Sequence, residues 1–419
     1  MDINQLLKGI NCSCGKRHDC DIKYVYIEKN AARYLTDICK DFQSALIVAD
    51  QNTYAAAGEI TEKVLSEKIT KRVIFDGTKI LVPDEAAIAT VEQSLLGIDI
   101  IVGIGSGVVQ DLCKYVSHQN KIPYLVVATA PSMDGYASNG AAMIMGGMKV
   151  TYPAGLPLAI IGDVNVLKNA PIEMIKAGYG DIIGKFSALN DWKLSHLINN
   201  EYFCQYIYDL TFEQIDSTLK LASGILDRNE ESIKALMEAL VVIGVLMSFA
   251  GSSRPASGSE HHLSHYFEIT GIIDGSEYFP HGIDVAYSTV ITAMLREEIL
   301  NRPFKKNLNR LSAEELHKCL VKVYGPVANS CIDLQSKIGN YKDRSSVYLE
   351  KEKGIRAILE EMPSSEDIYD MLDLVGLDIT EFYTLYGKEK IKNAVLFAKE
   401  LKDRFTVLWL YYDFFSKNE

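Results

Sequence analysis

The first 165 residues alternate between short runs of aliphatic residues and longer stretches of helical periodicity, and this alternation limits the possible folds most strongly. Strands that alternate with helices of about 10–15 residues are typical of βαβ units, which form a parallel sheet. We therefore expect an α/β fold here. The expected strands are residues 44–50, 72–75, 98–103, 123–128 and 158–163. The first strand is expected to end in a turn at Gln51-Asn52, after which a helix continues to about Lys68, and a second helix is expected over residues 84–96.

Helical periodicity continues almost without interruption from Asn165 onward. Before it, two apolar segments (141–145 and 148–152) flank Gly146-Gly147, a typical hairpin signal. A chain of 419 residues is long enough for two domains. We predict a Rossmann-like nucleotide-binding domain over residues 1–165 and an all-helical domain over residues 166–419. The amphipathic helices expected near the end are residues 313–324, 355–362 and 391–410.

The formal net charge of −12 argues against a nucleic-acid or anionic-membrane partner, since either would require a basic surface. The most apolar segment, residues 239–250, is shorter than the roughly 20 residues that span a bilayer, so we expect a buried helix. The N-terminal sequence does not resemble a signal peptide. We expect a cytoplasmic protein whose eight cysteines are reduced thiols.

Residues 102–114 (VGIGSGVVQDLCK) form a strand that leads through glycines into a helix. Glycines allow the backbone to approach a pyrophosphate, and the N-terminus of the next helix then binds it. The G-x-G-x-G spacing of Gly103, Gly105 and Gly107 differs from the usual G-x-G-x-x-G. A tight strand-to-helix turn without a ligand would have a similar sequence.

Polar residues also follow two other predicted strands. Asp50 follows the first strand, where it could accept a hydrogen bond from a cofactor ribose or simply form a turn. Residues 129–138 (TAPSMDGYAS) follow the fourth strand. Ligands of open α/β sheets bind beyond the carboxyl ends of the strands, so we expect Thr129, Ser132 and Ser138 to face the cofactor cleft.

Four of the eight histidines lie between positions 261 and 281. His261 and His265 are four residues apart, which places them on one face of a helix, and His281 follows in the sequence Pro-His-Gly. Asp181 lies in an apolar, glycine-rich stretch, where a carboxylate is costly unless it is paired or bound to a metal. Imidazoles and a carboxylate suit a divalent metal such as Zn²⁺, although a histidine pair can also be merely structural.

Five segments, in this order, resemble the glycerol-1-phosphate dehydrogenase family, within the dehydroquinate synthase and iron-type alcohol dehydrogenase superfamily. They are residues 103–114, TAPSMDGYAS, AGYGDIIGK, SRPASGSEHHLSH and PHG, and the resemblance covers about residues 20–300. It implies a dehydroquinate synthase-like fold and the NAD(P)H-dependent reduction of dihydroxyacetone phosphate to sn-glycerol 1-phosphate. It also implies one Zn²⁺ or Ni²⁺ per subunit and a homodimer.

The resemblance assigns roles to individual residues. It implies that Asp181, His261 and His281 bind the metal, and that His265 either supports the ligands from outside or relays a proton. His262 points about 100° around the helix from His261, so we expect no role for it. Asp134 would lie on the substrate side. The residues that would line the cofactor are Gly105, Ser106, Gly107, Asp111, Thr129 and Ser132.

Arg254 is the first candidate for the substrate phosphate, because the related synthases carry an anion-binding arginine seven residues before the first histidine ligand. Its guanidinium could bind a phosphate in a bidentate manner if the helix of His261 extended that far. Lys185, on the same helical face as Asp181, is the second candidate. Either residue could instead be an ordinary surface charge.

Two other activities compete with this hypothesis. A glycerol dehydrogenase would share the metal ligands but use an unphosphorylated substrate, and the absence of a cation near the metal would favour it. A dehydroquinate synthase-type lyase would need several cations and a glutamate in place of Asp181. A protein that binds a metal or nucleotide without catalysis is a third possibility.

One motif does not belong to either predicted site. Cys12, Cys14, His18 and Cys20 form a C-x-C…H-x-C sequence that could hold Zn²⁺ or could be a turn with reduced thiols.

Overall fold

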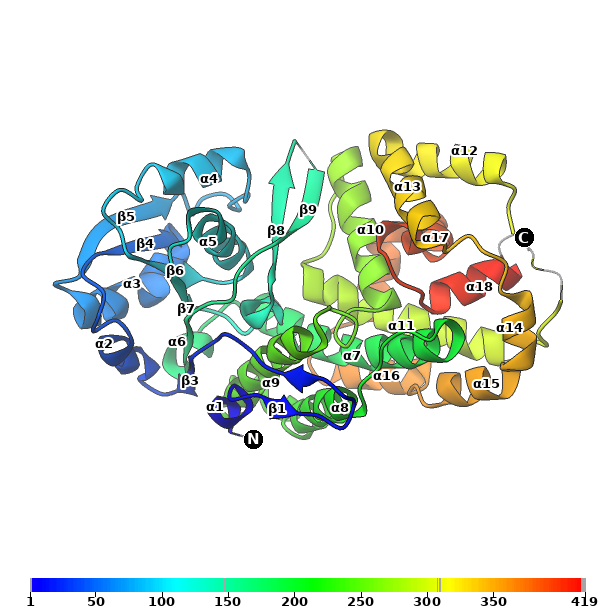
Figure 1. Ribbon diagram of the computed structural model, residues 1–419, viewed down its shortest axis with the longest axis horizontal. Coiled ribbons are helices and arrows are strands. Elements are labelled where there is room, and N and C mark those ends of the chain that lie inside the picture. Colours follow the sequence, from blue (N-terminus) through cyan, green and yellow to red (C-terminus); the bar gives the residue numbers. More distant parts are fainter. Residues whose placement is uncertain (1, 147, 307, 309, 416–419) are drawn as a thin grey trace. The chain divides into compact units, whose positions relative to one another are not determined.

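The computed structural model describes residues 2–146, 148–306, 308 and 310–415 (Figure 1). The chain forms two compact units. The first contains the chain up to Tyr179 together with Asp216–Ser252, and the second contains Gly180–Ile215 and the chain from Ser253 onward. All strands of the described residues end by Asp163, where the sequence changes to helical periodicity. The predicted domain boundary near residue 165 remains a proposal. This boundary would place the nucleotide loop in one domain and the proposed metal ligands in the other.

A six-stranded parallel sheet forms the centre of the first unit, in the order β3-β10-β7-β6-β4-β5. This confirms the predicted α/β fold. Apolar side chains from four of the strands are buried against helix α3 and the N-terminal helical turns. The strands are β3 (Tyr24–Glu28), β4 (Ala45–Asp50), β5 (Ile69–Phe75), β6 (Ile100–Gly105), β7 (Tyr124–Ala128) and β10 (Ala159–Asp163).

Strand β3 is the one sheet strand that the sequence pattern did not predict. It lies at the edge of the sheet and pairs only with β10 among the described strands. Tyr24 at its start is exposed and its neighbour Val25 is buried, so the strand alternates between polar and apolar environments. An edge strand of this kind lacks the continuous apolar run of the central strands.

The chain reverses direction across the sheet between β4 and β6. Strand β4 is followed by a helix and then by β5 on one side, whereas β6 is followed by a helix and then by β7 on the other side (Figure 1). In open α/β sheets this reversal leaves a crevice outside the carboxyl ends of the two strands, where ligands bind. Asp50 ends β4 and Gly105 ends β6, so both lie at this edge.

Two hairpins and several helices complete the first unit. The predicted hairpin is present as β8 (Gly140–Met145) and β9 (Met148–Pro153), with Gly147 outside the described residues. A smaller hairpin joins β1 (Ile10–Asn11) to β2 (Arg17–His18). The helices are α1 (Ile3–Leu6), α2 (Leu35–Ile38), α3 (Gln51–Leu65), α4 (Glu85–Glu92), α5 (Gly107–Asn120), α6 (Val164–Leu167) and α9 (Glu230–Ala250).

Helix α9 contains the apolar segment that the sequence predicts to be buried. It is long and apolar enough to cross a membrane, but 78% of its most apolar window is buried inside the protein. Asn229 caps its N-terminus and Gly251 ends it in the left-handed conformation. The helix is therefore part of a protein core, as predicted.

The second unit is helical throughout its described residues, as the sequence predicts. Helix α12 matches its predicted range, but the helix predicted over residues 391–410 is interrupted, because Lys402 adopts an extended conformation. The elements are α7 (Ile172–Asn199) and α8 (Gln205–Lys220), which both units share, and α10 (Ser259–Asp274), α11 (His281–Leu300), α12 (Ala313–Tyr324), α13 (Ala328–Ile338), α14 (Ser345–Glu350), α15 (Glu352–Glu360), α16 (Ser365–Asp373), α17 (Ile379–Phe397) and α18 (Val407–Phe415).

Glycines let helix α7 approach helix α11 closely. A Cβ atom at Gly180 would lie 2.4 Å from the carbonyl oxygen of Gly282, and one at Gly184 would lie 2.5 Å from a methyl group of Val285. Asp181 lies between these glycines, and His281 begins α11. The glycine pattern around Asp181 therefore brings the carboxylate-bearing helix against the histidine-bearing one.

Gly180→Ala should destabilise the protein by about 1–3 kcal/mol, because the new methyl group would collide with helix backbone that cannot move aside. Thermal unfolding measures the loss. The matched control is Gly354→Ala in α15, where the nearest atom is the end of the Leu197 side chain, at 3.1 Å. That variant should unfold at or above the wild-type temperature because alanine favours the helix. Unchanged unfolding of Gly180→Ala would contradict the close packing.

Candidate metal centre and cofactor site

The three predicted metal ligands lie together. Helix α7 supplies Asp181, α10 supplies His261 and α11 supplies His281, and one ligand atom from each lies within 4.8 Å of the others. The His261 Nε2 atom is 3.5 Å from Asp181 Oδ1. Tetrahedral Zn²⁺ with ordinary bond lengths would separate a nitrogen and an oxygen ligand by about 3.4 Å. The arrangement therefore suits a divalent ion.

Neighbouring side chains orient both imidazoles. Glu260 Oε1 lies 2.6 Å from His261 Nδ1, and the Ser264 hydroxyl lies 3.2 Å from His281 Nδ1. With Nδ1 engaged in this way, Nε2 of each ring is the nitrogen that can bind a metal. Such outer partners fix the ring orientation and raise the basicity of the ligand. Glu260 and Ser264 were not predicted, although their place on the same helix as His261 could have suggested them.

The charges around His261 favour its neutral form, which metal binding requires. Burial, together with the positive charges of Lys185 and Lys402, holds the pKa of His261 well below its usual value. Burial also raises the pKa of the Glu260 carboxyl to about 7, and the charge of Asp191 adds to this shift. Lys402 was not predicted, because it is far from His261 in the sequence.

Lys185 forms a buried ion pair with Asp181. Its Nζ is 2.6 Å from Asp181 Oδ1, and neither side chain is more than 1% exposed. The predicted shared helical face is therefore present. Asp181 Oδ1 faces both Lys185 and His261, so the buried carboxylate is surrounded by the groups that can compensate its charge.

His265 and His262 differ in their surroundings. The His265 ring centroid lies 5.4 Å from that of His281 and 6.5 Å from that of His261, and the side chain is half-buried. It borders the ligand set without belonging to it. His262 is fully buried, and neither of its ring nitrogens has a hydrogen-bond partner among the described residues. His262 therefore lies outside the metal centre, as predicted.

The glycine loop forms the predicted strand-to-helix turn. Strand β6 ends at Gly105, Ser106 is the N-cap residue of α5, and a Cβ atom at Gly105 would lie 2.7 Å from Val109 Cβ. Gln110, an unpredicted member of the site, donates from Nε2 to the carbonyl oxygens of Gly103 and Gly105. The glycines are thus needed for the close contact of helix and strand, and the helix N-terminus lies at the crevice edge.

Residues 129–138 lie beside this loop. The Thr129 amide donates to the Gly105 carbonyl oxygen at 3.2 Å, and a Cβ atom at Gly107 would lie 3.3 Å from the Met133 sulfur. Buried Lys114 donates to the carbonyl oxygens of Gly135 and Gly140 and contacts Ser138 Oγ. Burial lowers the pKa of Lys114. No role was predicted for this lysine, whose hydrogen bonds connect residues 135–140 to α5.

The remaining predicted cofactor and substrate residues are placed as follows. Asp50 caps helix α3, because its Oδ1 accepts from the amides of Asn52 and Thr53. The helix starts directly after β4, so the turn expected at Gln51-Asn52 is wrong. Asp111 lies in the first turns of α5, with Lys114 Nζ 3.4 Å from its carboxylate. Ser132 hydrogen-bonds with Tyr136, and Asp134 precedes a 3-10 turn (η2, Gly135–Ala137) that packs on Gly244 of α9.

Arg254 does not share a helix with His261, since α10 begins only at Ser259, after the N-cap residue Gly258. The helix of His261 does not extend back to Arg254, so the condition attached to a bidentate phosphate contact from that helix is not met, and Pro255 and Gly258 lie between the two residues. Its guanidinium pairs with Glu201 and with Asp403, and it lines a small cavity together with Arg404. A role in phosphate binding remains a proposal.

Known proteins share this fold. The sequence model of the iron-containing alcohol dehydrogenase family matches residues 26–171. An iron-containing alcohol dehydrogenase from Thermococcus thioreducens superposes with a TM-score of 0.62 at 13% identity, over 94% of this chain and 99% of that one. Glycerol dehydrogenase from Schizosaccharomyces pombe gives 0.54 at 18% identity, over 88% and 92%. The fold is that of the iron-containing alcohol dehydrogenases.

Sequence relatives define the family more narrowly. Glycerol-1-phosphate dehydrogenase [NAD(P)+] of Halalkalibacterium halodurans is 30% identical over 97% of this chain and 98% of its own length. The enzyme of the same name from Thermococcus sibiricus is 35% identical over 65% of this chain and 75% of its own length. The chain belongs to the glycerol-1-phosphate dehydrogenase family.

Glu260→Gln should weaken metal binding by about 10- to 100-fold, because an amide is a weaker acceptor for the His261 Nδ1–H group than a carboxylate. Titration of the metal-free protein with Zn²⁺ measures the change. The control is the neighbouring residue: His262→Phe should leave the affinity unchanged. An equal loss in both variants would show that the region is merely sensitive to substitution.

Proposed function

We propose that the protein reduces dihydroxyacetone phosphate to sn-glycerol 1-phosphate, reversibly, with NADH or NADPH and one divalent metal ion per subunit. The observation that carries the proposal is the Asp181–His261–His281 triad, with the positive charges of Lys185 and Lys402 acting on His261. Membership of the glycerol-1-phosphate dehydrogenase family supports the same activity.

Asp181, His261 and His281 would hold the ion, either Zn²⁺ or Ni²⁺. Bound there, a divalent ion supplies Lewis-acid polarisation of a carbonyl oxygen. The reduced nicotinamide supplies the hydride. The residues proposed to hold the cofactor lie at the carboxyl edge of the sheet or in the segments that follow it: Asp50, Gly105, Ser106, Gly107, Asp111, Thr129, Ser132 and Ser138.

The protein's own residues then have distinct tasks. Glu260 and Ser264 hold the imidazoles of His261 and His281 in position. His265, half-buried beside His281, is proposed to pass a proton to the oxygen of the reduced substrate, directly or through water. Asp134 is proposed to position the substrate from the loop after β7.

The substrate phosphate requires a cation. Lys185 and Arg254 are the residues proposed from the sequence, and Lys402 joins them because its charge acts on His261. Cations beside the triad favour a phosphorylated substrate over free glycerol. They do not make the site a lyase, since the triad keeps an aspartate where the lyase hypothesis expects a glutamate. We further propose that the enzyme is a cytoplasmic homodimer.

The activity is tested with purified protein, NADH or NADPH, and either dihydroxyacetone phosphate or dihydroxyacetone. We expect oxidation of the cofactor with the phosphorylated ketone, loss of this activity with EDTA and recovery with Zn²⁺ or Ni²⁺. Oxidation with dihydroxyacetone alone would make the protein a glycerol dehydrogenase. No oxidation with either ketone would reject the dehydrogenase proposal.

Replacing a phosphate-binding cation should raise KM for dihydroxyacetone phosphate roughly 10- to 150-fold, the equivalent of about 1.5–3 kcal/mol for a hydrogen bond to a charged group. KM for dihydroxyacetone should not change when Lys402 or Arg254 is replaced, whereas replacing Lys185 also removes the ion-pair partner of Asp181 and should alter metal binding as well. Lys402→Ala, Lys185→Met and Arg254→Ala test the three residues. For Arg254 the matched control is Glu201→Gln, which breaks the same ion pair but keeps the guanidinium. Equal effects of Arg254→Ala and Glu201→Gln would leave Arg254 a structural role only.

A further inference from the structure

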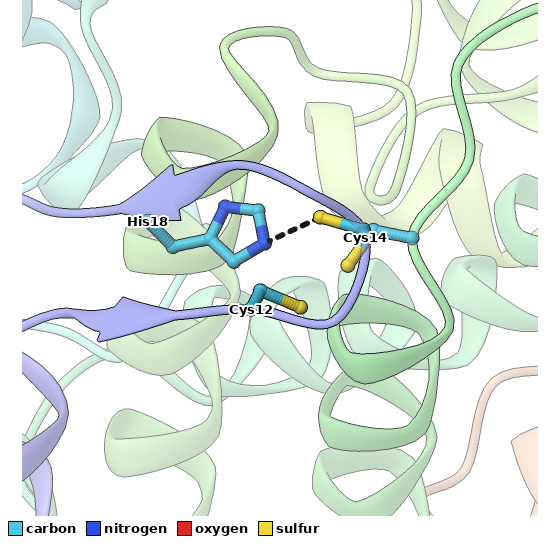
Figure 2. A group of neighbouring side chains, drawn as sticks. Cys12, Cys14 and His18 are labelled. Carbon is cyan, nitrogen blue, oxygen red and sulfur yellow. Dashed lines mark hydrogen bonds between the residues drawn. The ribbon is translucent and has the colours of Figure 1, made fainter.

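The N-terminal hairpin gathers three side chains with metal-binding atoms. Strands β1 and β2 pair only through Ile10 with His18 and Asn11 with Arg17. The turn between them is closed by hydrogen bonds from the Cys12 amide to the Lys16 carbonyl oxygen and from the Gly15 amide to the Cys12 carbonyl oxygen. Gly15 has a φ of +86°, a conformation that favours glycine. Cys12, Cys14 and His18 are thereby directed toward one another (Figure 2).

The separations fit a tetrahedral ion. The Cys12, Cys14 and His18 ligand atoms lie within 4.8 Å of one another, and Cys14 Sγ is 3.4 Å from His18 Nε2. Zinc bonds of about 2.3 Å to sulfur and about 2.0–2.1 Å to nitrogen would separate a thiolate and an imidazole ligand by about 3.6 Å, and two thiolates by about 3.8 Å. The Cys14–His18 separation matches the first of these values, and the other separations exceed the required ones by no more than about an ångström, so small side-chain adjustments would complete the site.

His18 is oriented in the manner of a metal ligand. It is fully buried, and its Nδ1 lies 3.0 Å from the carbonyl oxygen of Phe249 at the end of α9. A carbonyl oxygen can only accept, so Nδ1 carries the proton and the Nε2 lone pair faces Cys14. The ring also stacks on the Phe249 ring, with centroids 5.5 Å apart and an interplanar angle of 14°. A hydrogen bond from Nδ1 to a backbone carbonyl is the usual outer partner of a metal-bound histidine.

We propose that Cys12, Cys14 and His18 bind a structural zinc ion, separate from the ion of Asp181, His261 and His281. Thiolates and imidazole select Zn²⁺ over the harder cations. A fourth ligand, either a water molecule or another thiolate, completes the tetrahedron. The ion would stabilise the hairpin, whose strands are only two residues long and whose pairing therefore has little stability of its own. It anchors this hairpin to the C-terminal end of helix α9 through His18.

The test separates this ion from the catalytic one. The full-length variant Asp181→Ala/His261→Ala lacks two ligands of the triad, and it is purified under anaerobic conditions with a reducing agent. We expect it to retain one zinc ion per chain by elemental analysis. Replacement of that ion by Co²⁺ should give the near-ultraviolet charge-transfer absorption of a cobalt–thiolate bond. The sulfur count from X-ray absorption then identifies the fourth ligand.

Further substitutions assign the ion to the hairpin. Adding Cys12→Ser and Cys14→Ser to that variant should remove the zinc and the cobalt–thiolate absorption, whereas adding Cys20→Ser should preserve both. Cys20 is the matched control because it lies in the same segment, and its thiol, whose pKa burial raises to about 11, is not part of the cluster. Bound zinc should also protect Cys12 and Cys14 from alkylation. Cys20 is not a ligand, so zinc should not protect it once unfolding exposes its thiol.

Two results would overturn the proposal. One is an Asp181→Ala/His261→Ala protein without zinc and without a cobalt–thiolate band, a result that does not depend on whether the cysteine variants fold. The other is an unchanged zinc content when Cys12 and Cys14 are replaced by serine in the Asp181→Ala/His261→Ala variant. Neither result concerns the reduction of dihydroxyacetone phosphate, so the proposed activity and the zinc site fail independently.

Discussion

The burial of the Asp181 carboxylate is the constraint on which the second unit depends. The residue is fully buried, and an ionised carboxylate in such a place costs several kcal/mol unless other charges compensate it. Lys185, one turn further along α7, and His261 on α10 provide that compensation. A divalent ion would do so more completely, and the proposed ligands, their outer partners and the surrounding cations are arranged as a metal centre would require.

This constraint also explains the glycines of helix α7. Asp181 can come close to His261 and His281 only if α7 approaches the neighbouring helices closely, and side chains at Gly180 and Gly184 would collide with α11. The same device operates in the first unit, where Gly105 brings α5 against β6 and places the helix N-terminus at the sheet edge. In both units glycines allow two elements to pack closely. This packing positions Asp181 in the second unit and the N-terminus of α5 in the first.

The sequence predicted the features that depend on local patterns. The central strands, the glycine loop, the β8–β9 hairpin and the spacing of the histidines all follow from periodicity and residue type. Features that depend on distant parts of the chain were missed. The edge strand β3 lacks a continuous apolar run. The charge of Lys402 acts on His261 only because the fold brings distant segments together, and the same is true of the pairing of Arg254 with Glu201 and Asp403.

We expect a divalent ion to occupy the space between Asp181, His261 and His281. Crystals of the enzyme purified without chelators, measured on both sides of the zinc and nickel absorption edges, test it most directly. We expect an anomalous peak within bonding distance of one Asp181 carboxylate oxygen and of Nε2 of both histidines. Well-ordered side chains at these three positions with no anomalous peak between them, and with Lys185 alone bound to Asp181, would contradict it.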